Sequence, residues 1–155
     1  MSVNNICESI KVLSDGEIEL KLCLGLESNR QFYYIIYRVS DNEKVGQCGI
    51  RMQKNEENYY LGNIEYEILP YSRGNHYAEK ASRLLARVAS YYNVDSLIIT
   101  ANPENKPSIK TIENLGASFI EIRKVPKNTR LYRGGNQYVS IYGWDLKEKG
   151  DRNLW

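Results

Sequence analysis

The stretch ILPYSRGNHYA, residues 68–78, marks the point where the pattern of the chain changes. Before Pro70 apolar and polar residues alternate, whereas after Gly74 apolar residues recur at helical spacing. A strand end, a short turn and a helix start therefore meet here. The first N–H groups of a helix lack partners within the helix and carry partial positive charge. The turn predicts a phosphate site with Arg73 at its rim, although an ordinary strand-to-helix turn has the same pattern.

The segments before this turn have the period of strands with one buried face. Asp15-Gly16 and residues 41–43 have the composition of turns, and residues 53–58 form a polar loop. Consecutive strands joined by such turns predict an antiparallel meander. The predicted strands are Ile10–Leu13, Glu17–Leu24, Gln31–Val39, Lys44–Met52 and Tyr59–Leu69.

The segments after the turn predict helix, strand, helix and two strands. Apolar residues from Ala78 to Tyr92 follow one helix face, and Ser96–Ala101 is typical of a buried strand. Pro107 suits a first helical turn and Gly116 a helix end. The last strands are predicted at Ser118–Val125 and Asn136–Leu146. We expect one α+β domain over residues 1–146, with a long helix after the fourth main strand, a shorter helix after the fifth, and a tail over residues 147–155.

Composition excludes several classes of protein. The 155 residues are 42% hydrophobic and 26% charged, which argues against a disordered chain or a coiled coil. The charge sum of 21 − 19 = +2 gives no strong field toward nucleic acid or anionic membrane. No apolar run approaches the ~20 residues of a membrane span, and the N-terminus lacks the apolar stretch of a signal peptide. We therefore expect no membrane partner.

The cysteines and the single histidine narrow the chemistry further. Cys7, Cys23 and Cys48 are scattered without CxxC spacing, which favours reduced thiols in a cytoplasmic protein. A histidine-rich metal site is impossible with His76 alone, and we expect no metal.

Residues 73–78, RGNHYA, resemble the (Q/R)-x-x-G-x-(G/A) pyrophosphate loop of the GNAT superfamily of acyl-CoA N-acyltransferases. Asn102–Ser108 resembles the family's N-x-x-S signature, and a helix ending at Leu115-Gly116 follows it. The resemblance is specific over Lys44–Glu121, about half the chain, and is greatest with the branch of ribosomal-protein and small-molecule N-acetyltransferases. It implies a GNAT-like, mostly antiparallel twisted sheet and acetyl-CoA as the acyl donor.

Carried over by position, the resemblance assigns cofactor contacts to three short segments. It implies that the CoA pyrophosphate is bound by backbone amides, with Arg73 beside them. These are the amides of Gly74, Asn75, His76, Tyr77 and Ala78. It also implies that strand-edge peptide groups of Ile68 and Leu69 bind the pantetheine arm, in the way that a peptide strand pairs with the edge of a sheet. Asn105 and Ser108 would contact the pantetheine or a phosphate.

Two positions depart from the family pattern. His76 replaces the usual loop glycine, so we expect its backbone to be helical. We expect its side chain to contact a phosphate or cap the helix rather than to act as a general base. Ile112 occupies the place where many relatives carry a tyrosine acid, so that role is empty or filled elsewhere.

The implied reaction needs a proton acceptor, because an amine of pKa ~10.4 is mostly protonated at neutral pH. Glu65 and Glu67 lie on the polar face of the strand before the loop, and we favour Glu65 because it is nearer the thioester end of an extended arm. Both could instead be solvated surface charges. Tyr142 on the last strand is a candidate acid, with a core tyrosine as the alternative. A strand N–H could stabilise the oxyanion.

The acceptor side is predicted to be open. GNAT domains generally place two helices between their first and second strands, but Gly25–Gln31 is too short for them. A second copy of the chain, as in a homodimer, or the long loop near Lys127–Gly135 could complete the site. Five basic residues of this region are consistent either with a solvated loop or with a binding site for an anion. They are Arg123, Lys124, Lys127, Arg130 and Arg133. The near-neutral net charge of the chain argues against nucleic acid as a partner.

Two functions follow from the sequence. The leading interpretation is an N-acetyltransferase that moves an acetyl group from acetyl-CoA to a primary amine of a small molecule or peptide, by direct attack. The alternative is a non-catalytic acyl-CoA sensor or interaction domain on the same fold, because fold resemblance does not prove turnover.

Overall fold

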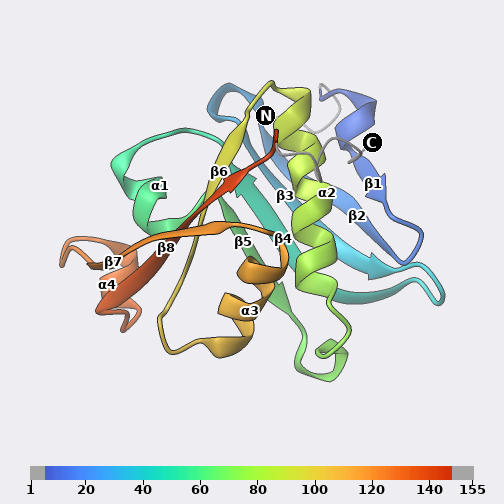
Figure 1. Ribbon diagram of the computed structural model, residues 1–155. Coiled ribbons are helices and arrows are strands. Elements are labelled where there is room, and N and C mark those ends of the chain that lie inside the picture. Colours follow the sequence, from blue (N-terminus) through green and yellow to red (C-terminus); the bar gives the residue numbers. More distant parts are fainter. Residues whose placement is uncertain (1–5, 148–155) are drawn as a thin grey trace.

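The computed structural model describes residues 6–147, which form two antiparallel sheets with helices against them (Figure 1). The strands are β1 (Val12–Ser14), β2 (Ile18–Leu26), β3 (Gln31–Arg38), β4 (Glu43–Arg51), β5 (Ile64–Ile68), β6 (Ser96–Ala101), β7 (Ser118–Lys124) and β8 (Tyr138–Asp145). The helices are α1 (Glu56–Leu61), α2 (Tyr77–Tyr91), α3 (Lys106–Asn114) and α4 (Arg130–Arg133), with 3₁₀ turns η2 (Glu8–Ile10), η3 (Glu27–Asn29) and η4 (Pro70–Ser72).

The larger sheet is the predicted meander, in the order β1-β2-β3-β4-β5 with every neighbouring pair antiparallel. The Asp15-Gly16 turn joins β1 to β2. Gly16 has φ +91°, and one oxygen of Asp15 accepts hydrogen bonds from the N–H groups of Glu17 and Ile18. Glycine reaches such a φ without steric cost, which explains why this dipeptide closes the hairpin.

Helix α2 covers one face of this sheet. Its apolar stripe, which includes Ala81, Leu85 and Val88, is fully buried against the even-numbered residues of β3. On its outer side Glu79 and Arg83 form an i,i+4 ion pair at 3.8 Å. Burial of a continuous apolar stripe is the main source of stability for a helix of this length.

The smaller sheet has the order β6-β8-β7 and carries helices on both faces. On one face Ile112 of α3 and Trp144 of β8 belong to the same core as α2. On the other face Tyr60 of α1 joins a second cluster with Val139 and Ile141, against which Leu131 of α4 packs. The predicted α+β, mostly antiparallel fold is therefore confirmed, with the long helix after the fourth of the main strands β2–β5.

Two predicted strands are wrong in part. Residues 59–69 form the end of α1, a turn, and only then β5. Asn55 caps α1 by accepting a hydrogen bond from the N–H of Asn58, and Gly62, with φ +86°, ends it. The helix forms because it buries Tyr60 in the second cluster. At the other end of the chain Ile10 lies in η2, and β1 begins only at Val12.

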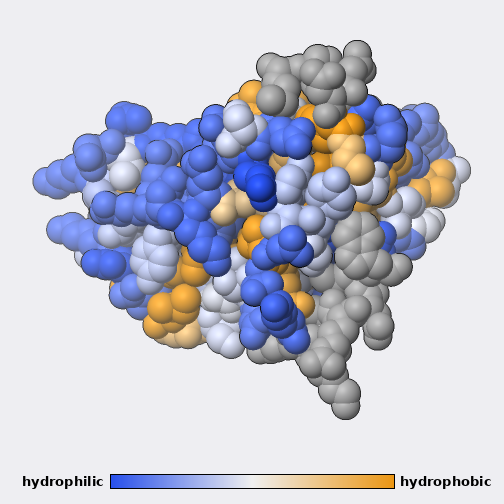
Figure 2. All heavy atoms as spheres, turned by 90° about the horizontal axis from the view of Figure 1, so that it is seen from above, coloured by the Kyte–Doolittle hydropathy of each residue, from blue (hydrophilic) through white to orange (hydrophobic). Residues whose placement is uncertain are grey.

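The connection between β2 and β3 is as short as predicted and holds only η3 instead of a helix pair. No helix within residues 6–147 is long and apolar enough to cross a membrane. The face seen from above in Figure 2 is largely hydrophilic, with hydrophobic residues in small separate patches. The expected boundary at residue 146 stays a prediction, since residues 148–155 lie outside those that the structure describes.

Candidate active site

Strands β5 and β6 meet at one point and then diverge. The N–H of Asn63 donates to the carbonyl of Ile98 at 2.6 Å, and the side-chain oxygen of Asn63 accepts from the N–H of Ile98 at 2.7 Å. Its amide nitrogen donates to the carbonyl of Arg51 on the opposite side. Beyond this residue β5 and β6 separate (Figure 1). Asn63 therefore closes the narrow end of a splayed sheet.

The edge of β5 that faces the splay has free peptide groups. Arg51 N donates to Asn63 O and Leu69 N donates to Val45 O, which fixes the register of the β4–β5 ladder. By the alternation of an antiparallel ladder, the peptide groups of Ile64, Tyr66 and Ile68 point away from β4. The expected strand edge is thus carried by Ile64, Tyr66 and the N–H of Ile68. The carbonyl of Ile68 already accepts a hydrogen bond from Arg73 Nε, and the N–H of Leu69 is bonded to β4.

The turn from β5 to α2 presents a row of free N–H groups. No hydrogen bond in the described part of the chain engages the N–H groups of residues 74–79, and the first helical bond runs from Lys80 N to His76 O at 3.0 Å. A Cβ added to Gly74 would meet nothing within 4 Å, so the space before these groups is open. Convergent N–H groups with the helix dipole behind them form an anion site.

The backbone of His76 differs from the prediction. A helical angle was expected, but His76 has φ +61° and ψ +25°, in the left-handed region. Histidine tolerates this conformation better than β-branched residues do, at a cost of about 1–2 kcal/mol. His76 therefore has a backbone conformation that glycine would adopt without steric cost. Its side chain is exposed and makes no capping hydrogen bond.

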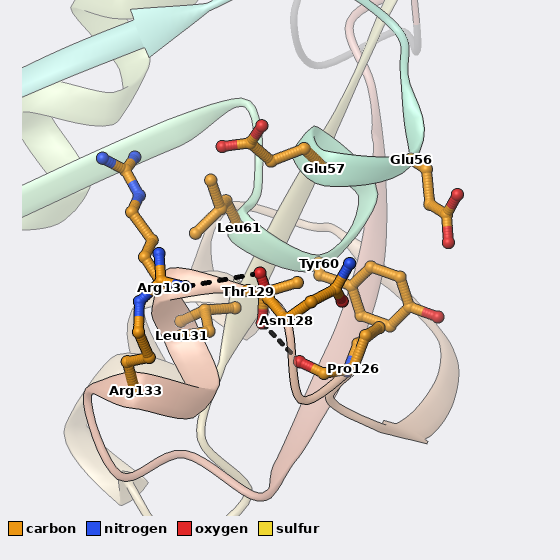
Figure 3. A pocket seen from close by; sticks show the side chains of 10 residues that line it. All are labelled: Glu56, Glu57, Tyr60, Leu61, Pro126, Asn128, Thr129, Arg130, Leu131 and Arg133. Atoms are coloured by element: carbon orange, nitrogen blue, oxygen red, sulfur yellow. Dashed lines mark hydrogen bonds between the residues drawn. The ribbon is translucent and has the colours of Figure 1, made fainter.

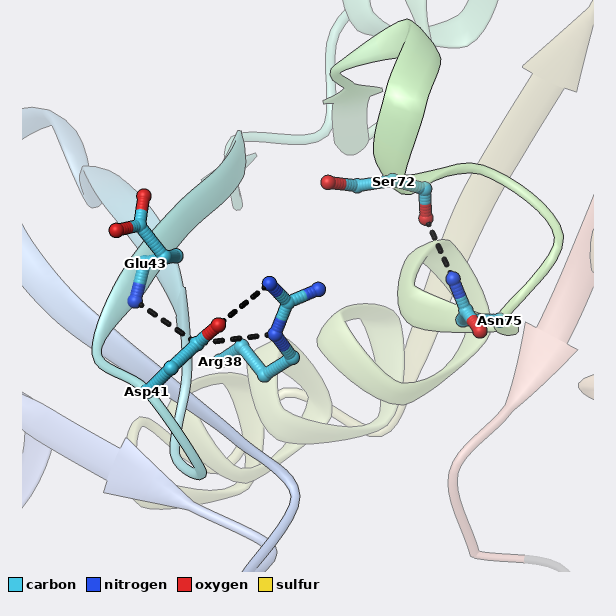
Figure 4. A network of polar contacts seen from close by, with 5 residues as sticks. All are labelled: Arg38, Asp41, Glu43, Ser72 and Asn75. Carbon is cyan, nitrogen blue, oxygen red and sulfur yellow. Dashed lines mark hydrogen bonds and ion pairs between the residues drawn. The ribbon is translucent and has the colours of Figure 1, made fainter.

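The polar side chains of the turn hold its shape. Arg73 Nε donates to Ile68 O at 3.0 Å, and Asn75 Nδ2 donates to Ser72 O at 3.0 Å (Figure 4). Figure 4 also shows Arg38, at the end of β3, with two hydrogen bonds to Asp41. The hydrogen bonds to Asp41, and a further interaction with Tyr77 at the start of α2, raise the pKa of Arg38. The sequence analysis missed this link between β3 and α2.

Glu65 and Glu67 lie on the opposite face of β5 from α2, and both are exposed. Glu65 Oε2 accepts a hydrogen bond at 2.6 Å from Nη1 of Arg51, whose side chain is only 5% exposed. Arg51 also donates to Gly62 O at 2.9 Å. Glu65 is thereby fixed in one orientation with its second oxygen unbonded. Glu67 has no polar partner within residues 6–147.

A shallow groove of about 300 Å³ runs along this open face of the sheet, in front of the two carboxylates. The ring of Tyr33 lies over Gly49, where an added Cβ would come within 2.5 Å of it. Side chains of four strands border the groove, among them Cys23, Tyr33, Ile35, Gln47, Glu65 and Glu67. Carboxylates beside an aromatic ring suit a cationic amine.

The residues from the N-x-x-S stretch lie on the other side of β5. Asn105 caps α3, since its side-chain oxygen accepts a hydrogen bond from Ser108 N at 3.3 Å. Ser108 Oγ lies 2.8 Å from the hydroxyl of Tyr66. This contact joins α3 to β5, and Tyr66 was not among the predicted site residues.

Tyr142 lies within the main core of the protein. Its ring packs edge-on against Phe119 at 5.5 Å, and burial raises the pKa of its hydroxyl. No described hydrogen bond connects Tyr142 to Ser108 or to β5. Its role as an acid stays a prediction, while its packing is that of a core tyrosine.

The basic loop of residues 127–135 folds over α1 instead of the groove. It forms α4, capped by Thr129, whose Oγ1 accepts a hydrogen bond from Tyr132 N. Between α4 and α1 is a cavity of about 340 Å³, and Glu56, Glu57 and Arg130 are among the residues that line it (Figure 3). The residues that line the groove beside Glu65 and those that line this cavity do not overlap. The expectation that this loop walls the open groove therefore finds no support.

Comparisons with solved structures agree with this architecture. Each identity is below 25%, so these likenesses concern the fold. A proposed ribosomal-protein-serine acetyltransferase from Vibrio cholerae matches with TM-score 0.65 and 14% identity, over 86% of this chain and 97% of that one. The ribosomal-protein-S5-alanine acetyltransferase of Vibrio fischeri matches with TM-score 0.62 and 15% identity, over 79% and 65%. Mycobacterium smegmatis RimJ, in complex with CoA-disulfide, matches with TM-score 0.59 and 18% identity, over 77% and 55%.

The chain therefore spans nearly all of the first of these proteins and less than two thirds of the other two. No curated protein matches its sequence. The model of the acetyltransferase (GNAT) domain matches residues 11–118, which include β1–β6, the turn before α2 and the whole of α3. This chain belongs to the GNAT acetyltransferase family, and is an acyltransferase of that family.

Proposed function

We propose that this acyltransferase moves an acetyl group from acetyl-CoA to a primary amine, by direct attack of the amine on the thioester and without a metal. The observation that carries the proposal is the row of free N–H groups at residues 74–79, in front of open space and next to the free edge of β5. A diphosphate suits the N–H row, and a peptide-like arm suits a free strand edge.

The proposed binding mode follows from these two features. The amides from Gly74 to Ala78 would hold the pyrophosphate, with the guanidinium of Arg73 beside it. From there the arm would run back along β5 past Ile68 toward Ile64, where free peptide groups can pair with its amides. The side-chain nitrogen of Asn105 has no partner within residues 6–147 and could donate to the arm. MccE, a structural neighbour of 14% identity, is in complex with acetyl-CoA and AMP.

Glu65 is the proposed proton acceptor. Its unbonded oxygen faces the open side of β5, and the ion pair with Arg51 holds it in place. Glu67 is one strand repeat closer to the anion site and is the second candidate. A free N–H of the β5 edge would stabilise negative charge on the acyl oxygen. The acceptor would approach along the groove that Tyr33 and the two carboxylates border.

The open groove leaves the size of the acceptor unrestricted on one side. A small molecule or an exposed peptide amine would fit, and a second copy of the chain could complete the wall. The cysteines of the described residues are free thiols, which supports a reducing, cytoplasmic setting.

Substitution Glu65→Gln tests the assignment of the base. The change keeps the hydrogen bond to Arg51 possible but removes the proton acceptor, so we expect kcat to fall on the order of 100-fold. Calorimetry should show CoA binding unchanged. Thiol release from acetyl-CoA with a panel of amines measures turnover. Glu19→Gln, the same change at a partly buried glutamate of β2, is the matched control.

Three results would contradict parts of this proposal. Full turnover by Glu65→Gln would exclude Glu65 as the base and leave Glu67. Binding of CoA by the wild type without turnover of any amine would favour the non-catalytic sensor. Absence of CoA binding by the folded protein would exclude the proposed function altogether.

A further inference from the structure

Strand β7 is an outer strand of the smaller sheet, and only one of its two edges is paired. The sheet order β6-β8-β7 gives β7 a single neighbour, β8. The outer strand of the larger sheet, β1, has three residues, whereas β7 has seven. An outer strand of this length presents a row of free peptide groups, which is a template for pairing with another strand.

The hydrogen bonds at the end of the β7–β8 ladder show which of these peptide groups are free. Val125 N donates to Gln137 O at 2.9 Å, so the peptide N–H of Val125 points toward β8. From Glu121 onward the register with β8 is regular, and peptide groups alternate in direction along a strand. Those of Ile122 and Lys124 therefore point away from β8. Within residues 6–147 no strand pairs with them.

The side chains around this free edge are hydrophobic and exposed. Four large ones lie on β7 and on the adjoining end of β8, and each is between 47% and 57% exposed. They are Phe119, Ile120, Ile122 and Tyr138. An exposed hydrophobic outer strand tends to associate unless proline or charges of one sign protect it. Strand β7 has no proline, and its charges are of both signs.

The order of these charges fits a second, antiparallel copy of β7 in one register. For a ladder to form, outward-pointing residues must face each other, so the register changes in steps of two. With Ile122 opposite Ile122, Glu121 of each copy lies opposite Arg123 of the other. One step in either direction places Glu121 opposite Glu121, or Arg123 opposite Arg123. Opposite charges across two strands stabilise the pairing, and like charges destabilise it.

We propose that two copies of this chain pair through β7, about a two-fold axis at Ile122, and so join their smaller sheets into one. At the axis the two Ile122 residues exchange both N–H···O hydrogen bonds. The flanking charges are available for the contact. Glu121 Oε2 accepts a hydrogen bond from Tyr59 of α1, whereas Oε1 lies 3.9 Å from Arg123 Nε of the same chain, beyond hydrogen-bond distance.

Hydrophobic contacts must supply much of the affinity. The register of β7 with β8 shifts between Phe119 and Glu121, and this irregularity limits how far the new ladder extends. The exposed side chains beside the ladder, including Phe119 and Tyr138, then add buried apolar area. None of the residues of β7 lines the groove beside Glu65, so this inference is independent of the proposed function.

Sedimentation equilibrium of the full chain tests the association. We expect the wild type to form a dimer. Ile122→Lys puts two like charges at the axis and should raise the dissociation constant at least about tenfold. Val12→Lys, on the outer strand β1, is the matched control, because Val12 is 52% exposed and Ile122 53%. It should leave the dissociation constant unchanged. Circular dichroism should show that both variants are folded.

A charge exchange tests whether the two copies of β7 face each other. Glu121→Arg and Arg123→Glu each place like charges opposite one another in a dimer of identical chains, and each should weaken the dimer about tenfold. In an equimolar mixture of the two variants, every Arg lies opposite a Glu. The mixture should therefore form a heterodimer at concentrations at which each variant alone is a monomer.

A disulfide tests the register. In a hydrogen-bonded antiparallel pair the Cα atoms are about 5.5 Å apart, which suits a disulfide. Ile122→Cys, in a Cys7→Ser, Cys23→Ser background, should therefore form a covalent dimer with oxidised glutathione. Lys124→Cys in the same background is the matched control, because the proposed register does not place Lys124 opposite itself.

Four results would overturn the inference. A wild type that stays monomeric up to ~1 mM would exclude a second copy and leave the edge to an extended segment of another protein. A dimer that Ile122→Lys does not weaken would lie elsewhere on the surface. Absence of a heterodimer in the mixture would exclude the facing charges. Equal cross-linking of Ile122→Cys and Lys124→Cys would exclude the register.

Discussion

On β3, Phe32, Tyr34 and Ile36 are fully buried beneath α2, whereas Tyr33, Ile35 and Tyr37 on the opposite face are only partly buried. Both sets belong to one strand and have similar hydrophobicity. The difference comes from the short η3 connection, which leaves the second face without the helix pair that this connection could have held. One covered face supplies the core, and the other remains available for an acceptor.

The two cysteines on these faces give the largest expected contrast. Cys48 faces α2, and burial raises the pKa of its thiol strongly; Cys23 lies exposed on the other face. In a Cys7→Ser background, we expect a thiol reagent to label Cys23 at least about a thousandfold faster than Cys48, whose reaction needs an opening of the core. Mass spectrometry of the labelled peptides gives both rates. Similar rates would mean that the open face is covered in solution, as in a homodimer.

Two neighbouring isoleucines of β3, one on each face, allow the two faces to be compared by their contribution to the free energy of unfolding. Ile36→Ala removes a side chain that is 0% exposed, and should lower the free energy of unfolding by about 3 kcal/mol. Ile35→Ala, on the groove, should cost less than about 1 kcal/mol. Urea unfolding of both variants measures the difference. An equal loss in both would show that the open face is packed against something in solution.

The smallest expected effect is on the pH dependence of stability, and comes from Asp41 at the polar end of the covered face. Hydrogen bonds from Arg38 lower the pKa of the Asp41 carboxyl. Because its folded-state pKa lies below the unfolded value of ~3.9, Asp41 stabilises the fold above that pH and loses the contribution as the pH falls further. The melting temperature should therefore fall slightly more between pH 5 and 3 in the wild type than in Asp41→Asn. Asp41 is exposed and Arg38 is partly exposed, so salt should weaken the difference.

Local patterns were sufficient to predict most of the fold. The meander and α2 follow from alternation and from a helical stripe, both of which can be read from neighbouring residues. The short helix α1 was missed because it forms through Tyr60, whose partners Val139 and Ile141 lie far along the chain. A six-residue helix has too little periodicity to reveal such a contact.

In the candidate site, too, the contacts between neighbouring residues could be predicted and those between distant residues could not. The turn of residues 73–78 is contiguous in sequence, so its residues could be named in advance, although the left-handed backbone of His76 was not predicted. The Arg51–Glu65 pair joins residues 14 positions apart, and Tyr66 meets Ser108 from 42 positions away. Only the packing of strands and helices brings these groups together.

The side chain of Asn63 takes the place of a missing residue in a β-ladder. Because its amide oxygen and nitrogen bond to Ile98 and Arg51, the strands can part without leaving a buried peptide group unsatisfied. The point at which β5 and β6 begin to separate is thus set by a single amide side chain. Asn63→Gln lengthens this side chain by one methylene, and would therefore shift the point at which the two strands part while leaving residues 73–78 unaltered.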